Sequence, residues 1–316
     1  MPTSGTSSLR RPAKGQIFLQ SSGSSWAATA SATITGDTPA RNRFALRTRS
    51  VAIDSRTDAV RRDLADIRLA DRVFAPHYAV PTRRSIGRIT AISDSVDGVT
   101  LSQALPGEPF DVLEFTSTHG WGRSPIDGSV GFVSRDSLIG EFEASHIVVA
   151  RDATLYADAS TARPLPTSLP MGSRVAAISA NDDWCEVDGG YVAADALQRL
   201  SDDAGDAVDH ALRLRDTAFL AGGRSGAGVD AAGLIFLAFS LAGSPPPRFL
   251  DLQAETFGTA LAEGDVLRRG DLLFFADHVA LLVDGETVIH VDDVVRCEPL
   301  AALDRFGPIR ARRRPA

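Results

Sequence analysis

Residues 219–243 read Phe-Leu-Ala-Gly-Gly-Arg-Ser-Gly-Ala-Gly-Val-Asp-Ala-Ala-Gly-Leu-Ile-Phe-Leu-Ala-Phe-Ser-Leu-Ala-Gly. A glycine-rich approach leads into a stretch that is apolar nearly all round, as in a buried helix. Asp230 is a good N-cap, because its carboxylate can accept hydrogen bonds from the free N–H groups of the first turn. Gly243 and the three prolines that soon follow end the helix. The segment therefore predicts a buried helix near residues 230–242.

The first turn of this helix is a place where a nucleophile can be activated. A helix dipole lowers the pKa of a cysteine there, so that the thiolate forms near neutral pH. Position 231 is alanine, which offers no such chemistry. Taken alone, the segment fits an ordinary core helix that follows a glycine turn.

A second pattern lies downstream, where residues 270–275 form a turn that enters a strand. Residues 278–283 and 287–291 alternate as two strands, and the three residues between them predict a β-hairpin. That loop length places His278 diagonally across from His290 on one face of the hairpin. A histidine base that is oriented by a second polar side chain is the arrangement a thiol nucleophile requires.

Together these patterns resemble the NlpC-type (p-sixty) family of cell-wall cysteine peptidases, over residues 209–310. The resemblance implies a papain-like α+β fold, with Ala231 at the position of the family's cysteine, His278 as the base and His290 as the orienting residue. It covers about a third of the chain and follows the family's motifs in order, at residues 219–225, 230–233, 269–275, 277–281 and 289–290. It also implies contacts with substrate from Arg224, Ser225, Asp230, Arg248 and Asp277, and it implies no cofactor and no metal.

The chain departs from the family's pattern around one cleft. Besides Ala231, the neighbouring serine is Ala232 and a preceding tryptophan is Ala221. Two polar positions of the substrate segment have become Phe249 and Leu250. Because loss of a covalent nucleophile typically costs many powers of ten in rate, the family's peptidase reaction is expected to be impaired.

Other groups offer weak substitutes for the missing thiol. Cys297 is expected to be a packed thiol, Cys185 lies in another predicted domain, and Ser225 precedes the helix by several residues. The two histidines with Asp292 and Asp293 could form a metal site on paper, but their spacing matches no strong ligand pattern.

Two similar segments precede this region, at residues 107–138 and 171–197. Each contains an alternating strand, a strand with a tryptophan, a glycine turn and a Gly-aromatic-Val strand, which favours a small β-barrel. Both resemble bacterial SH3-like domains, and we expect Trp121 and Trp184 in the barrel cores rather than on ligand platforms. The predicted fold is thus α+β, with a tail (1–57), a lead-in (58–80), two SH3-like barrels (81–140 and 145–198) and an NlpC-type domain (207–311).

Composition limits the function further. The chain has 316 residues, 44% of them hydrophobic, and a net charge of −7, which argues against nucleic acid as the main partner. No apolar run approaches the length of a membrane span. The first 50 residues hold seven Lys or Arg and one Asp, and they lack the long apolar core of a secretory signal. They resemble a disordered tail, an organellar transit peptide or the product of a mis-set start codon, so a cytoplasmic location is expected from sequence and the cell envelope from the family.

Two functions follow from the resemblance. Active relatives cleave the bond between D-γ-glutamate and diaminopimelate, or lysine, in peptidoglycan stem peptides. The chain is therefore expected to be a muropeptide endopeptidase-like bacterial protein that is catalytically impaired by Ala231. The alternative is a pseudoenzyme that binds a muropeptide or a protein partner through the old cleft.

Overall fold

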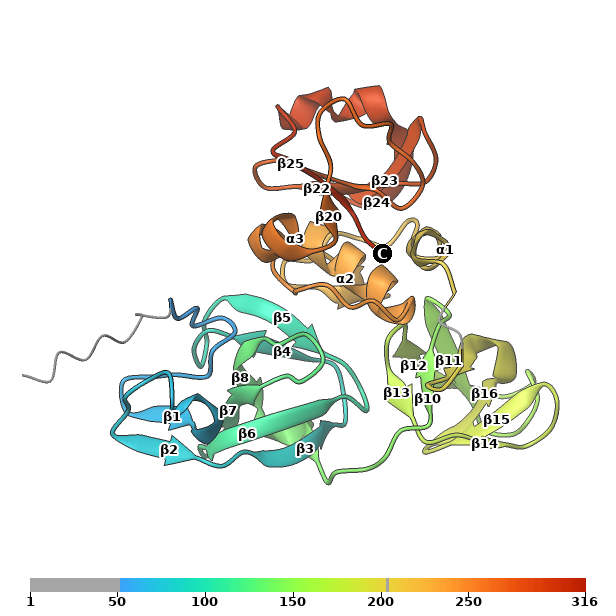
Figure 1. Cartoon of the computed structure of the whole chain (residues 1–316). Coiled ribbons are helices and arrows are strands. Elements are labelled where there is room, and N and C mark those ends of the chain that lie inside the picture. The colour runs from blue at the N-terminus through green and yellow to red at the C-terminus, as the bar shows by residue number, and fades with distance from the viewer. Residues whose placement is uncertain (1–51, 203–204) are drawn as a thin grey trace, which may run out of the picture. The chain divides into compact units, whose positions relative to one another are not determined.

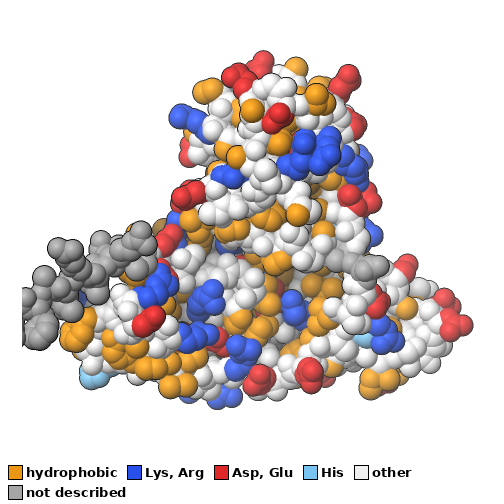
Figure 2. Space-filling model, in the orientation of Figure 1, with side chains coloured by type: hydrophobic (Ala, Val, Ile, Leu, Met, Phe, Trp, Pro, Cys, Tyr) orange, Lys and Arg blue, Asp and Glu red, His pale blue; other side chains and the backbone are white. Residues whose placement is uncertain are grey.

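The computed structural model describes residues 52–202 and 205–316, so most of the predicted tail lies outside the described residues (Figure 1). Within them the chain is a mixed α+β protein that is built mostly from antiparallel sheets. It begins with a short parallel pair, β1 (Leu64–Asp66) and β2 (His77–Ala79), around the 3-10 helix η1 (Ile67–Leu69). Figure 2 shows apolar side chains gathered beside β2. Phe74, which precedes β2 in the sequence, is 95% exposed.

The first large sheet, called here the N-terminal sheet, has seven antiparallel strands in the order β5-β4-β8-β7-β6-β3-β9. Its inward-facing residues form a core around Ile86, Ile92 and Phe110. The described ladders leave β5 and β9 unpaired with each other, so the closed barrel predicted for residues 81–140 is not found. The elements are β3 (Thr82–Ile86), β4 (Thr90–Ser93), β5 (Thr100–Ala104), β6 (Pro109–Phe115), β7 (His119–Arg123), β8 (Val130–Ser134), η2 (Arg135–Ser137) and β9 (Leu138–Ile139).

Two smaller antiparallel sheets follow, called here the middle sheets, with the orders β13-β10-β17 and β12-β11-β16-β15-β14. They share one apolar core, which includes Val148, Leu155 and Val192. They form no single closed ladder in the described residues, so the second predicted barrel is not found either. The elements are β10 (His146–Val148), β11 (Asp152–Tyr156), β12 (Pro164–Pro170), β13 (Arg174–Val175), β14 (Ile178–Ser179), β15 (Trp184–Val187), β16 (Gly190–Ala193), η3 (Ala194–Ala196) and β17 (Leu197–Arg199).

The two tryptophans expected in these cores lie in different surroundings. Trp121 is 3% exposed and packs with Ala59 and Val130 in a small separate cluster, so it is buried as expected but lies outside the core around Ile86. Trp184 is only half-buried, and it lies outside the core of the middle sheets. For Trp184 the core prediction was wrong, because its strand turns Cys185 and Val187 inward instead.

The C-terminal region packs helices against a six-stranded antiparallel sheet with the order β20-β25-β21-β22-β23-β24. The sheet is covered on both faces, by α1 and α2 on one and by η4 on the other, so β21 and β22 are apolar throughout. The elements are α1 (Ala207–Leu212), β18 (Arg224–Ser225), β19 (Gly228–Val229), α2 (Ala231–Leu241), α3 (Leu250–Thr256), β20 (Thr259–Ala260), β21 (Leu272–Phe274), β22 (Val279–Leu282), β23 (Thr287–Val291), β24 (Val295–Pro299), η4 (Leu300–Phe306) and β25 (Ala311–Arg314).

The predicted helix and hairpin are both confirmed. α2 begins at Ala231, and the Asp230 carboxylate accepts a hydrogen bond from the Gly233 N–H at 2.6 Å. β22 and β23 pair with Leu281 opposite Ile289, which leaves the three-residue loop that the sequence predicted. Among the described residues, no helix combines the length and the apolar character that crossing a bilayer demands.

Gly233 lets the glycine-rich approach pass directly under the first turn of α2. A Cβ at this position would lie 2.0 Å from the carbonyl oxygen of Gly223. Gly233→Ala is therefore expected to lower the free energy of unfolding by about 2 kcal/mol, although alanine is the better helix former by about 1 kcal/mol. Chemical denaturation measures the change. Gly264→Ala is the matched control, because a Cβ there meets nothing within 4 Å, and an equal loss in both variants would contradict the explanation.

Candidate functional site

A cavity of about 410 Å³ opens at the N-terminus of α2. It brings together Ala231 and His278, the positions expected for nucleophile and base. The N-terminal sheet contributes Leu101 to its wall, so the cavity is not made by the C-terminal region alone. The lining residues are Leu101, Phe219, Ala221, Gly222, Asp230, Ala231, Ala232, Arg248, Phe249, Leu250, Asp277, His278, Val291 and Asp292.

Asp230 forms hydrogen bonds to three segments that meet at this cavity: the glycine loop at Gly222, the first turn of α2, and the segment before α3 at Arg248. One carboxylate oxygen caps α2, and the other accepts a hydrogen bond from the Gly222 N–H at 3.0 Å. Both oxygens also accept hydrogen bonds from the Arg248 guanidinium, at 3.0 and 2.7 Å. Asp230 and Arg248 thus line the cavity as a mutually neutralised pair, and a ligand that contacts one of them meets no net charge there.

His278 and His290 lie in contact, as the hairpin predicted. The Nε2 atom of His278 is 3.0 Å from Nδ1 of His290, and Nε2 of His290 is 2.6 Å from a carboxylate oxygen of Glu298. Because a carboxylate accepts, His290 donates from Nε2, and its Nδ1 must accept from His278. The proton of neutral His278 is then on Nε2. The Nδ1 atom of His278 makes no hydrogen bond in the described residues, so its lone pair is free, as a base requires.

Three further residues complete this arrangement, and the sequence analysis did not identify them. Arg305 donates to Glu298 at 2.5 Å, which holds the carboxylate against His290. The ring of Phe306 stacks on His278, with the centroids 3.9 Å apart. Glu298 lies opposite Val288 in the β23–β24 ladder, diagonal to His290, so the rule that related the two histidines could have found it. Arg305 and Phe306 lie on η4, and no local sequence signal pointed to them.

Burial is the main influence on the charges of these groups. It lowers the pKa of His278 to about 4, with a further contribution from the charge on His290. Burial also lowers the pKa of His290, against the opposing effect of Glu298. Burial acts to raise the pKa of Glu298, but hydrogen bonds from Arg305 and His290 outweigh it and the net shift is downward. At neutral pH the histidines are therefore neutral and Glu298 is ionised.

The depressed pKa of His278 predicts a loss of stability in acid. Between pH 4 and 6.5 the unfolded chain binds more protons at this residue than the folded chain, so unfolding is favoured as the pH falls. Lowering the pH from 7 to 4 is expected to cost about 2–3 kcal/mol of unfolding free energy through His278. Urea titrations at several pH values measure this slope. His278→Asn should flatten it and the exposed-site control His77→Asn should not, so identical slopes in both variants would contradict the assignment.

Two residues expected to contact substrate lie elsewhere. Arg224 is 1% exposed and donates two hydrogen bonds, at 2.8 and 2.6 Å, to Glu108 in the turn between β5 and β6 of the N-terminal sheet. Ser225 is fully buried and donates to Gln103 at 3.1 Å. Neither lines the cavity, because both are used in the contact between the C-terminal region and the N-terminal sheet. Asp277 does line it as expected, and it is exposed without a cation partner in the described residues.

The described lining of the cavity at His278 contains no side chain of the usual nucleophilic types. Among the described residues that line it, none is Cys, Ser, Thr, Tyr or Lys. Cys185 is buried in the core of the middle sheets, and Cys297 packs against the core below α2, where burial raises the pKa of its thiol. No cluster of three potential metal ligands occurs in the described chain, and Asp292 is engaged by Arg305.

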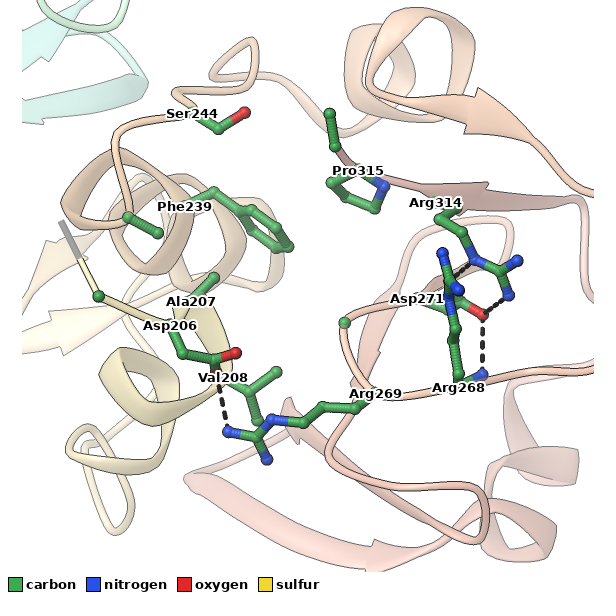
Figure 3. Close-up of a pocket in the computed structure, with 14 residues that line it drawn as sticks. Asp206, Ala207, Val208, Phe239, Ser244, Arg268, Arg269, Asp271, Arg314 and Pro315 are labelled. Atoms are coloured by element: carbon green, nitrogen blue, oxygen red, sulfur yellow. Dashed lines mark hydrogen bonds and ion pairs between the residues drawn. The ribbon is translucent and has the colours of Figure 1, made fainter. Parts of the chain in front are cut away.

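A separate cavity of about 250 Å³ lies where Phe239 and Ala242, at the other end of α2, meet residues 205–208, 268–271 and 314–316 (Figure 3). Its charges are largely paired with one another. Arg269 donates a hydrogen bond to Asp206 at 2.8 Å. Arg314 donates two hydrogen bonds of 2.7 Å to the buried carboxylate of Asp271. It shares no residue with the cavity at His278, and its ion pairs join separate segments of the C-terminal region.

Comparison with known proteins agrees with this geometry. Residues 216–302 match the model of the NlpC/P60 family. No curated protein matches the chain. The structure is similar to that of an NlpC/P60 family protein from Bacillus cereus, with a TM-score of 0.61 and 18% identity over 74% of this chain and 99% of that one. It is also similar to an NlpC/P60 endopeptidase from Photobacterium damselae, with a TM-score of 0.50 and 10% identity over 72% of this chain and 70% of that one.

A shorter match is RipD of Mycobacterium tuberculosis, a non-catalytic NlpC/p60 domain protein adapted to peptidoglycan binding. It has a TM-score of 0.27 and 25% identity, and the match covers 32% of this chain and 89% of that one. The family match encloses the capped helix, the histidine pair and Glu298, so residues 216–302 of this chain are an NlpC/P60 family domain.

Proposed function

We propose that the chain is a non-catalytic muropeptide-binding protein that descends from an NlpC/P60 endopeptidase. The observation that supports the proposal is the cavity at the N-terminus of α2, which is lined by both Ala231 and a His278 that hydrogen-bonds to His290. In the proposal His278 corresponds to the family's base, and the methyl group of Ala231 takes the place of its nucleophile. A base without a nucleophile cannot form the acyl-enzyme, so the cleft can bind a peptide but cannot cleave it by the family's reaction.

The ligand proposed for this cleft is a peptidoglycan stem peptide that contains the D-γ-glutamyl-diaminopimelate bond. Support comes from the family match, whose members act on or bind peptidoglycan, and from the chemistry of the wall. Phe219, Phe249 and Leu250 provide apolar contacts, while the unpaired Asp277 carboxylate suits an ammonium group. The two regions at 81–140 and 145–198 are proposed to be SH3-like domains, the first of which lends Leu101 to the cleft.

The proposal predicts no turnover but measurable binding. Purified full-length protein, incubated with L-Ala-γ-D-Glu-diaminopimelate, is expected to release no dipeptide by liquid chromatography. Calorimetry should detect saturable binding of the same peptide, weakened about fivefold or more in Asp277→Asn because an ion pair is lost. Asp71→Asn, at another exposed carboxylate, is the matched control.

Each outcome of this experiment has a clear reading. Dipeptide release that His278→Ala abolishes would show an active enzyme with another nucleophile, and it would overturn the non-catalytic assignment. Absence of both release and binding would overturn the muropeptide assignment. Equal binding by the Asp277 variant and the wild type would retain the ligand but remove Asp277 from the contact.

A further inference from the structure

The outer face of the five-stranded middle sheet carries an unusual share of the chain's polar aromatic residues. The chain has three Trp and three Tyr in total, and Trp184, Tyr156 and Tyr191 all belong to this one sheet. All three are half-buried and lie outside the core cluster, which is formed by the opposite face. The rings of Tyr156 and Trp184 meet edge to face, with centroids 5.1 Å apart. Partly exposed aromatic groups with polar tips are typical of binding surfaces.

The strand register places these residues in one continuous row. Tyr156 lies opposite Tyr191, Tyr191 opposite Glu186, and Glu186 opposite Ile178. Paired residues share a face of the sheet, so the row crosses β11, β16, β15 and β14 (Figure 1). Trp184 lies two residues before Glu186 on the same face. We call these five residues (Tyr156, Ile178, Trp184, Glu186 and Tyr191) the aromatic row.

Glu186 is the charged group of this row, and no cation neutralises it. Its side chain is exposed and makes no ion pair or hydrogen bond in the described residues. The segment that holds the middle sheets, residues 145–199, contains four arginines against seven carboxylates. Asp182 and Asp183, in the turn before Trp184, are likewise exposed and outside any described ion pair. The row is thus an apolar and aromatic surface in a negative field.

Aromatic side chains beside an unpaired carboxylate indicate which kind of ligand would bind to the aromatic row. A neutral ligand that covered the row would bury the Glu186 carboxylate without a partner, which is costly. A lysine or arginine side chain meets both needs at once, because its charge pairs with the carboxylate and its stem and head group pack on aromatic faces. We propose that the aromatic row is a docking surface for a basic peptide segment of a partner protein, separate from the cleft at His278.

The test measures binding of a defined basic peptide to the full chain. A fluorescein-labelled peptide of Gly-Lys repeats, with blocked ends, is titrated with protein and followed by fluorescence anisotropy. Binding should weaken about fivefold or more in Glu186→Gln, and similarly in Trp184→Ala. Glu255→Gln, at an exposed carboxylate on α3, should leave it unchanged. The peptide with norleucine in place of lysine should not bind, and higher salt should weaken the complex.

Glu186→Gln decides the test if Trp184→Ala fails to fold, because residue 186 is exposed and the amide keeps its shape. An equal loss in Glu186→Gln and Glu255→Gln would show attraction to net charge alone and would overturn the proposal. So would the absence of saturable binding. Tighter binding of an N-acetylglucosamine oligomer than of the lysine peptide, abolished by Trp184→Ala, would reassign the row to saccharides and also overturn it.

Discussion

Replacing Ala231 by cysteine is expected to create a thiol that iodoacetamide alkylates about tenfold or more faster than Cys185 or Cys297 at pH 7. The new thiol would lie in the first turn of α2, where the helix dipole favours the thiolate, and in the same cavity as His278. A pKa near 7 instead of about 8.5 would raise the thiolate fraction at pH 7 by more than tenfold. The existing thiols are expected to be slow, because Cys185 is buried in a core and the half-buried Cys297 packs against one, where burial raises the pKa of its thiol.

The protonation state of His278 affects how reactive the new thiol can be. With its pKa lowered to about 4, His278 is neutral at pH 7 and offers a thiolate no positive charge. A thiol within reach of its free Nδ1 changes this, since a thiolate and an imidazolium stabilise each other and titrate as a pair. The alkylation rate of Ala231→Cys should therefore depend on His278. Adding His278→Ala should slow it severalfold, down to the contribution of the helix dipole alone.

The neighbouring residue supplies a matched control. Ala232 is in the same helical turn and also lines the cavity, but it is only 6% exposed whereas Ala231 is half-buried, so Ala232→Cys shares the dipole and has less access to reagent. It should react slowly. If Ala231→Cys alkylates no faster than an exposed model cysteine between pH 6 and 8, the geometry of the site has been dismantled and a purely structural role becomes the better account. Peptide turnover is not expected of Ala231→Cys, because Ala221, Phe249 and Leu250, which also line the cavity, differ from the residues that the family resemblance implies there.

The parts of the site that could be predicted depend on local rules. Asp230 and the apolar run after it determine where α2 begins, since capping and periodicity act within a few residues. The period of two along a strand and the three-residue loop together determine that His278 meets His290. These features need no knowledge of the rest of the chain, and the structure confirms both placements.

The parts that could not be predicted depend on distant partners. Arg224 occupies a family motif and was expected at the substrate, yet its carboxylate partner Glu108 is 116 residues away in the sequence. Trp184 shares a local pattern with Trp121, but only the tertiary arrangement decides which faces a core. Arg305 meets Glu298 because η4 folds back over the sheet, which no local signal indicated. Whether the two predicted barrels close likewise depends on pairing between strands that are far apart in sequence.

The buried guanidinium of Arg224 is the centre of a charge network that connects the C-terminal region to the N-terminal sheet. Besides its two bonds to Glu108, it donates to the buried carboxylate of Asp127 at 3.1 Å. Burial acts to raise the pKa of Asp127, but Arg224 and a hydrogen bond from Ser102 outweigh it, so the pKa is lowered. Ser102 in turn accepts a hydrogen bond from Arg248 at 3.0 Å, which links the network to the wall of the cleft.

Arg224→Met is therefore expected to lower the free energy of unfolding by about 3–5 kcal/mol, because it leaves two buried carboxylates without their cation. Urea denaturation at pH 7 measures the loss. Arg163→Met is the matched control, since its ion pair with Asp158 is exposed and should contribute less than about 1 kcal/mol. Adding Glu108→Gln and Asp127→Asn removes the two carboxylate charges that have lost their partner, and it should recover part of the lost unfolding free energy. If Arg224→Met costs no more than Arg163→Met, the two carboxylates must have taken up protons or water in its place, and the network would not be what holds the N-terminal sheet against the cleft.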